Sequence, residues 1–278
     1  MNMKIISRLI AITIIGFFNF EGYGQYDWKS VNLQGMGFVT GINIHPTQPN
    51  VVYARTDVGG TYKWDQANDA WIAVTDGQVD YGNEGTALDV NHQDWVYILV
   101  SSNKSELYKS TDGGTNWVKN STFPSIYSNA NGNYRWSNNK LVVDQNNDGR
   151  NIYFASRKNG LIKSNDWGVT WIILTANLPT GDNEASFFWG QSFVAIDKSS
   201  GNSTTNSQTL YVGVQGYGVY KSTDEGMNWS LLPGGPAVTN KPVSGAISTY
   251  GKLHVTYSTT DDEYANGKHH DIFICIKL

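Results

Sequence analysis

The sequence predicts an all-β chain, folded as a β-propeller of four-stranded blades, and three observations support this fold class. A motif of the form Ser-x-Asp-x-Gly-x-x-Trp occurs three times. Its copies are separated by roughly 50 to 60 residues, a period typical of propeller blades. A short apolar run that is typical of a strand precedes each copy, and no helical 3.6-residue periodicity follows the N-terminal region. Short repeated strands of this kind pack as blades around an axis.

The copies of the motif share four fixed positions with a local structural chemistry. In a hairpin, Ser and Asp side chains hydrogen-bond to backbone groups of the turn, Gly adopts a positive φ angle, and Trp packs into the blade. We therefore expect a structural role for these residues and regard their aspartates as poor candidates for catalysis. They are Ser110, Asp112, Gly114 and Trp117, then Ser164, Asp166, Gly168 and Trp171, then Ser222, Asp224, Gly226 and Trp229. A degenerate copy ends at Trp71.

The N-terminus has the features of an export signal. Lys4 and Arg8 supply positive charge near an apolar run at 9–18, which is too short to span a bilayer. The sequence therefore predicts a signal peptide at 1–24 and an Asp-box-type propeller domain of about four to five blades at 25–278. We expect a secreted protein, extracellular or periplasmic, without membrane association once the signal is removed.

Composition argues against other partners and against cofactors. The chain has 20 Lys and Arg residues against 24 Asp and Glu, and it contains no basic cluster long enough to follow a phosphate backbone, so we expect no nucleic-acid partner. We predict no cofactor and no metal, because the histidines lack ligand spacing beyond the pair His269 and His270. The segment 144–149 resembles a calcium loop but lacks its bidentate Glu, so a polar turn is expected there.

The three motifs resemble the Asp-box, or BNR, repeat of sialidases and other propeller families. The stretch A-R-T-D-x-G-G at 54–60, with its flanks from 52 to 65, resembles glycoside hydrolase family 74. That family contains xyloglucan-specific endoglucanases and reducing-end-specific oligoxyloglucan hydrolases, and the resemblance covers essentially the whole mature chain. It implies two seven-bladed propellers facing each other across a cleft, which cut β-1,4-glucan backbones with inversion.

The resemblance also implies site residues. The general base of the family maps onto Asp57, whereas the general acid belongs to a second propeller that this chain lacks. Inverting hydrolases need both carboxyl groups, about 6.5 to 9.5 Å apart. Closing a ring of blades also takes more repeats than the chain has, so we expect a truncated form with weak or no activity alone. Trp64, Trp136 and Trp189 are candidates for stacking on sugar rings, with packing inside the blades as the alternative for each.

Two function classes remain open at this point. The first is an enzyme, or part of one, that acts on xyloglucan or a related β-glucan of plant cell walls. The second is a non-catalytic Asp-box propeller that binds glycans or proteins, which the missing acid and the short length favour. A sialidase ranks last, because its arginine cluster and its Tyr/Glu nucleophile pair cannot be assembled from this sequence.

Overall fold

The computed structural model of the chain describes most of the region that follows the predicted signal peptide. The residues described are 33, 35, 37–79, 82–101, 104–127, 130–131, 135, 140–174, 176–180, 190–235, 241–258 and 271–272. The predicted signal peptide, Trp136 and Trp189 lie outside them. Residues 33–278 form one compact unit.

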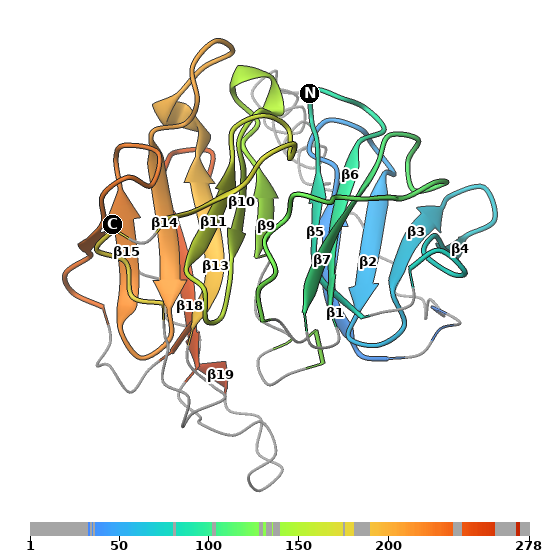
Figure 1. Cartoon of the computed structure of the whole chain (residues 1–278), viewed down its shortest axis with the longest axis horizontal. Coiled ribbons are helices and arrows are strands. Elements are labelled where there is room, and N and C mark those ends of the chain that lie inside the picture. Colours follow the sequence, from blue (N-terminus) through green and yellow to red (C-terminus); the bar gives the residue numbers. More distant parts are fainter. Residues whose placement is uncertain are drawn as a thin grey trace, which may run out of the picture. The chain divides into compact units, whose positions relative to one another are not determined.

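The described residues of this unit form five antiparallel sheets, one after another along the chain (Figure 1). Sheet 1 consists of β1 (Val39–Ile44), β2 (Val52–Thr56), β3 (Thr61–Asp65) and β4 (Ala70–Ala73), and sheet 2 of β5 (Asn83–Leu88), β6 (Val96–Ser101), β7 (Ser105–Ser110) and β8 (Val118–Lys119). Sheet 3 consists of β9 (Leu141–Val143), β10 (Ile152–Ala155), β11 (Leu161–Ser164) and β12 (Ile172–Leu174), and sheet 4 of β13 (Gln191–Asp197), β14 (Thr209–Val214), β15 (Gly218–Ser222) and β16 (Ser230–Leu231). Sheet 5 consists of β17 (Lys241–Ile247), β18 (Leu253–Ser258) and β19 (Asp271–Ile272). Within each sheet, every strand pairs with the next one in sequence, which is the connectivity of a propeller blade.

Consecutive sheets pack face to face, and this packing forms the core. Sheet 1 contributes Tyr53 to a cluster with Ile98 of sheet 2, and sheet 2 contributes Leu99 to a cluster with Phe154 of sheet 3. Clusters of the same kind join sheets 3 and 4 and sheets 4 and 5. Because β6 lies between neighbouring sheets on both of its faces, every residue of it is buried, and its sequence is an apolar run instead of an alternating pattern.

A polar residue follows or ends the first strand of each of the first four sheets and caps the loop that comes next. His45 Nδ1 accepts from the backbone N–H groups of Thr47 and Gln48, and Asp89 Oδ1 accepts from those of Asn91 and His92. The same kind of contact joins the carboxylate of Asp144 to Asn146 N–H, and that of Asp197 to Ser199 N–H. These turns are a second repeated feature of the sheets, beyond the Asp boxes.

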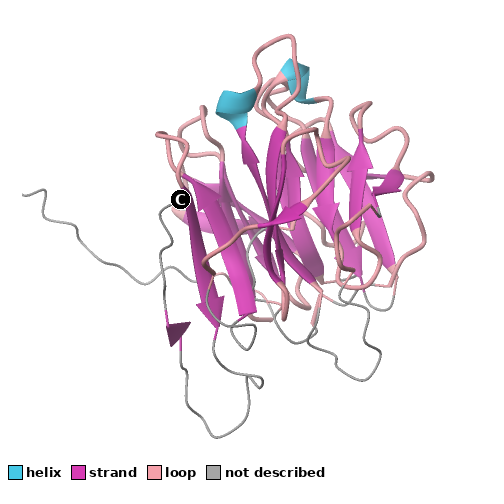
Figure 2. Ribbon diagram, turned by 90° about the vertical axis from the view of Figure 1, so that its left-hand side faces the viewer, coloured by secondary structure: helices cyan, strands magenta, loops and turns pink. Residues whose placement is uncertain are grey.

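The two ends of the sheets differ. At one end, named the box end here, lie the Asp boxes and two short 3-10 helices, η1 (Asn147–Gly149) and η2 (Lys198–Ser200). Figure 2 shows both helices beyond the same end of the strands. At the other end, named the hairpin end, the second strand of a sheet turns into the third, as at 57–60 in sheet 1.

The prediction of an all-β chain with four-stranded antiparallel blades is confirmed. Among the described residues, no helix has the length and hydrophobicity needed to cross a bilayer. The segment 144–149, expected as a polar turn, forms the loop that contains η1.

Candidate functional site

The turn that carries Asp57 is closed by the residue before it. Thr56 N–H donates to the carbonyl of Gly60, and the Thr56 hydroxyl accepts from Gly59 N–H at 2.8 Å. Thr hydroxyls favour this type of turn because they replace a backbone partner. The A-R-T-D-x-G-G motif is therefore a capped hairpin that presents residues 57 and 58 at the hairpin end of sheet 1.

The Asp57 carboxylate is held from two sides. Its Oδ1 accepts from Phe38 N–H at 2.7 Å, and its Oδ2 lies 2.9 Å from Nε of Arg135 in an ion pair. The Asp57 backbone N–H donates to the carbonyl of Phe38 at 3.2 Å. Asp57 is only 6% exposed, whereas the neighbouring Val58 is 45% exposed, so the carboxylate lies just beneath the surface.

The backbone packs closely around Asp57 because two neighbouring residues are glycines. A Cβ atom on Gly37, whose φ is +100°, would lie 2.6 Å from Asp57 Oδ1. A Cβ atom on Gly82 would lie 1.7 Å from the carbonyl oxygen of Asp57. Any larger residue at either position would displace the turn, so these glycines are needed for the observed position of the carboxylate.

A buried charged network lies next to this turn, where sheets 1, 2 and 3 meet. Lys140 Nζ donates to Glu84 Oε1 at 3.1 Å, and Arg55 donates to the backbone carbonyl of Glu84 at 2.6 Å. Burial lowers the pKa of Lys140 to about 8, although the Glu84 carboxylate opposes this shift. Burial likewise lowers the pKa of Arg55 to about 10. All three side chains are almost fully buried, so the network is not open to a substrate.

Sheet 3 repeats the turn of sheet 1 with a different residue in place of Asp57. Ser156 takes the role of Thr56, since its hydroxyl donates to Gly160 O at 2.7 Å and accepts from Asn159 N–H at 2.9 Å. The next residue is Arg157, so the hairpin forms there without a carboxylate. The turn therefore does not require a carboxylate at the position of Asp57.

Trp64, a candidate for sugar stacking, lies at the other end of the sheet. It is near the end of β3, about 10 Å along the strand from Thr61, and its ring meets that of Trp71 edge to face at 5.3 Å. A groove of about 740 Å³ near it runs between sheet 1 and the first Asp box, at the box end. The structure does not bring Trp64 to Asp57.

The three Asp boxes share one geometry, in the hairpin between the third and fourth strands. In the second box, Gly168 N–H donates to Ser164 Oγ at 2.8 Å, and Asp166 Oδ1 accepts from Ser164 Oγ and Thr170 N–H, both at 2.8 Å. Trp171 Nε1 donates to Gly168 O. The first and third boxes repeat the Ser and Asp contacts.

The indole of the first box makes a different contact. Trp117 Nε1 donates to Val74 O at 2.7 Å, and Gln78 Oε1 accepts from Trp117 N–H at 3.1 Å. Both partners belong to the segment that follows β4, so this box is hydrogen-bonded to the end of sheet 1.

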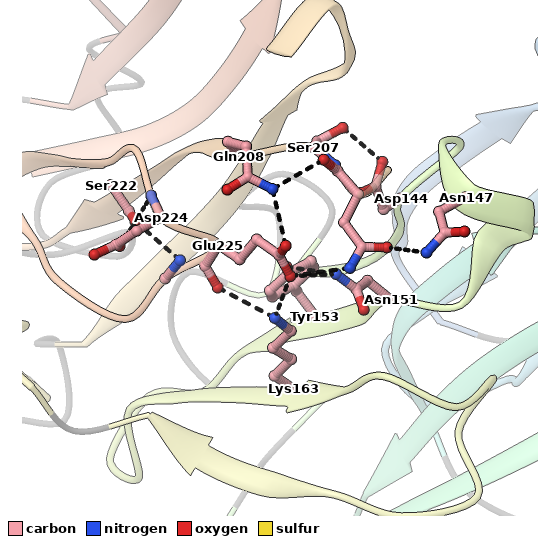
Figure 3. Close-up of polar contacts among 12 residues, drawn as sticks. Asp144, Asn147, Asn151, Tyr153, Lys163, Ser207, Gln208, Ser222, Asp224 and Glu225 are labelled. Carbon is pink, nitrogen blue, oxygen red and sulfur yellow. Dashed lines mark hydrogen bonds and ion pairs between the residues drawn. The ribbon is translucent and has the colours of Figure 1, made fainter. Parts of the chain in front are cut away.

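A second polar cluster joins sheets 3 and 4 at the box end (Figure 3). Glu225 Oε2 accepts from Lys163 at 2.9 Å and from Asn206 at 3.0 Å, and its Oε1 accepts from Gln208 at 2.9 Å. Burial opposes ionisation of Glu225, yet the hydrogen bonds from Lys163 and Gln208 outweigh it and lower the pKa of the carboxyl. Lys163 lies on β11 of sheet 3, whereas Glu225 lies in the hairpin after β15 of sheet 4, so the cluster connects these two sheets. Within the described residues, no group of three or more His, Cys, Asp and Glu side chains is arranged to hold a metal ion.

Several residues of the Asp57 site were not identified from the sequence. Arg135 and Phe38 contact the carboxylate, and Glu84 and Lys140 form the buried pair next to it. Lys140 offered a weak signal, since it is a charged residue directly before the apolar strand β9. No sequence signal indicated Arg135, because its contact partner Asp57 lies far away in the sequence.

Comparisons with known proteins identify relatives by sequence and by structure. No protein-family model matches the chain. A xyloglucanase from Paenibacillus sp is 37% identical over 267 residues, which cover 87% of this chain and 26% of the relative. The crystal structure of a GH74 enzyme from Niastella koreensis matches with a TM-score of 0.70 and 32% identity, covering 84% of this chain and 35% of that one. The β-propeller domain of Cps50 (Swd1) from Myceliophteria thermophila, at 10% identity and a TM-score of 0.52, shares the fold alone.

The coverage of these matches is unequal. They extend over most of this chain, but the chain spans only about a quarter to a third of the length of the relatives. The predicted β-propeller fold and the resemblance to family 74 are confirmed, and the chain is thus a relative of the glycoside hydrolase family 74 xyloglucanases, matching a part of them.

Proposed function

We propose that this chain is part of an exported glycoside hydrolase that cleaves xyloglucan or a related β-1,4-glucan with inversion, and that Asp57 is its general base. The observation that carries this proposal is the placement of Asp57. A carboxylate is fixed at the tip of a hairpin whose counterpart in sheet 3 forms without one, inside the motif that resembles family 74. Export is supported by the predicted signal at 1–24.

In the proposed reaction, the carboxylate of Asp57 takes a proton from a water molecule. The water oxygen bonds to the anomeric carbon, the glycosidic bond breaks, and a carboxylic acid outside the described residues protonates the leaving oxygen. Each Asp57 oxygen retains a lone pair beyond its contact with Phe38 or Arg135, so either can accept from water. The exposure of Val58, next to Asp57, supports a reaction at the surface of the hairpin end.

One observation favours a second candidate, a propeller that binds glycans without cleaving them. Both oxygens of Asp57 are already engaged by the chain itself, and Glu84, a nearby carboxylate in the described part, is paired with Lys140. A binding module would need no acid partner, and its affinity would not depend on the charge of Asp57.

The test compares Asp57→Asn with Asp65→Asn in the longest native polypeptide that carries this chain. Asn keeps the shape of Asp57 and removes its basicity, so xyloglucan hydrolysis should fall by about a hundredfold to ten-thousandfold. Asp65 lies on the same sheet at the box end, where its carboxylate caps a turn, so Asp65→Asn should retain the rate.

Proton NMR of the first product should show inversion at the anomeric carbon. Equal hydrolysis by the Asp57→Asn and wild-type proteins would refute the assignment of the base. Binding of xyloglucan by both, without hydrolysis by either, would establish the second candidate.

A further inference from the structure

We propose that Arg135 is a positioning residue, which acts through Asp57 by fixing the orientation of its carboxylate. This inference rests on the proposed role of Asp57 and extends it to a residue in the connection between sheets 2 and 3. Sheet 1 carries the carboxylate, whereas the guanidinium comes from a later part of the chain.

Arg135 and Phe38 form a clamp around the carboxylate. Arg135 Nε lies 2.9 Å from Asp57 Oδ2, and the guanidinium carbon of Arg135 lies 5.6 Å from the centroid of the Phe38 ring. The backbone of the same Phe38 donates to Asp57 Oδ1 at 2.7 Å. With one oxygen held on each side, the carboxylate plane cannot rotate freely about its Cβ–Cγ bond.

The burial of the pair makes its electrostatic effect large. The Arg135 side chain is 12% exposed and that of Asp57 is 6% exposed, so water screens their interaction weakly. Burying a charge is unfavourable unless a partner compensates it. Arg135 supplies this compensation, so the pair holds the carboxylate against the guanidinium.

Formation of the turn does not require the ion pair between Asp57 and Arg135. The equivalent hairpin of sheet 3 has the same hydroxyl cap with Arg157 in the position of Asp57. A buried ion pair commonly contributes little net stability compared with apolar residues of similar size. The arrangement is therefore best explained by a requirement for a carboxylate held in a fixed orientation at the hairpin end.

The test uses Arg135→Gln and Arg135→Lys in the longest native polypeptide that carries the chain, with Arg150→Gln as the matched control. Arg150 also lies over an aromatic ring, that of Trp167, but at the box end. Arg135→Gln should lower kcat for xyloglucan by about tenfold to a hundredfold, as expected for a misplaced reactive group. KM should change far less than kcat, and Arg150→Gln should leave both unchanged.

The conservative variant separates positioning from a merely structural role. Arg135→Lys keeps the charge but loses the planar geometry of the guanidinium, so it should restore only part of kcat. If Arg135→Gln fails to fold, the lysine variant still tests the loss of kcat.

A double substitution completes the design. If Arg135 acts through Asp57, Arg135→Gln should cause no further loss of rate in the Asp57→Asn background. The inference is overturned if Arg135→Gln retains the wild-type kcat, if it raises KM alone, or if its loss of rate adds fully to that of Asp57→Asn. Activity of Asp57→Asn at the wild-type rate would overturn both the proposed base and this inference, whereas loss of rate in Asp57→Asn alone would overturn only the inference.

Discussion

Replacing Asp166 by alanine tests the structural role of an Asp box. The Asp166 carboxylate accepts three hydrogen bonds, from Ser164 Oγ at 2.8 Å, from Thr170 N–H at 2.8 Å and from Thr170 Oγ1 at 2.6 Å. Ser164 is buried, so its hydroxyl loses a partner that water does not replace, whereas the exposed Thr170 can turn to solvent. Loss of a partner for one buried donor costs about 1–3 kcal/mol, and we expect this decrease in the free energy of unfolding.

Urea unfolding followed by tryptophan fluorescence measures this loss, with Asp166→Asn as the matched control. Asn retains an oxygen that can accept from Thr170 N–H and Ser164 Oγ, so its destabilisation should be clearly smaller. In a thermal melt, each kcal/mol corresponds to roughly 2–4 °C for a unit of this size. Glycan affinity per folded molecule should be the same in all three proteins, because the box lies at the end of the sheet away from Asp57.

The effect of Asp166 should depend on pH with a defined sign. Burial opposes ionisation of Asp166, yet hydrogen bonds from Thr170 and Ser164 outweigh it and lower the pKa of the carboxyl. In the first box, hydrogen bonds from Asn116 and Ser110 lower the pKa of Asp112 to about 2. A lowered carboxyl pKa stabilises the fold above the unfolded value near 4, and this contribution is lost as the pH falls towards 2. A difference between wild type and Asp166→Ala that is near zero at pH 7, or that does not shrink on acidification, would refute this reasoning.

Three further predictions concern buried positions. Glu84→Gln leaves the Lys140 ammonium buried without its carboxylate and should lower the free energy of unfolding by about 3–5 kcal/mol. The double variant Glu84→Gln with Lys140→Met should recover most of this loss. An equal loss of stability in the single and the double variant would contradict the buried pair. Burial lowers the pKa of Lys140 to about 8, so the wild-type protein should gain stability between pH 8 and the ordinary lysine value of 10.5, and the Lys140→Met variant should gain less. Gly245→Ala would place a Cβ atom 2.2 Å from the Phe193 ring and should cost about 1–3 kcal/mol. Thermal melts of Gly245→Ala with and without Phe193→Leu check this reasoning, since the smaller side chain should restore part of the stability.

Much of the fold was predictable because its signals are local. The Ser, Asp, Gly and Trp positions of each box act within one hairpin, so a single turn of sequence contains the donors, the acceptors and the positive-φ glycine. The apolar runs identified before the boxes became the second strands of the sheets, among them β6 and β10. The polar residues that cap the first strands, such as Asp89, were missed because Asp, His and Ser follow many strands without capping them.

The site was predictable only in part. The A-R-T-D-x-G-G motif located Asp57, and its hydroxyl cap is local, between Thr56 and Gly60. Trp64 was chosen for its residue type, but the direction of β3 carries it to the box end, away from Asp57. Trp136 and Trp189 lie outside the described residues and remain candidates on the sequence alone.

The sequence by itself therefore determined the repeated strands, the Asp-box hairpins and the turn that holds Asp57, because each depends on residues close together in the chain. Only the tertiary structure decided what surrounds that carboxylate. Phe38 precedes β1, and Arg135 follows sheet 2, and they meet at Asp57 because the first sheets pack face to face with their hairpin ends aligned. Glu84 and Lys140 pair for the same reason, since their strands begin at that end of neighbouring sheets. Such contacts depend on the packing of whole sheets, which no short motif encodes.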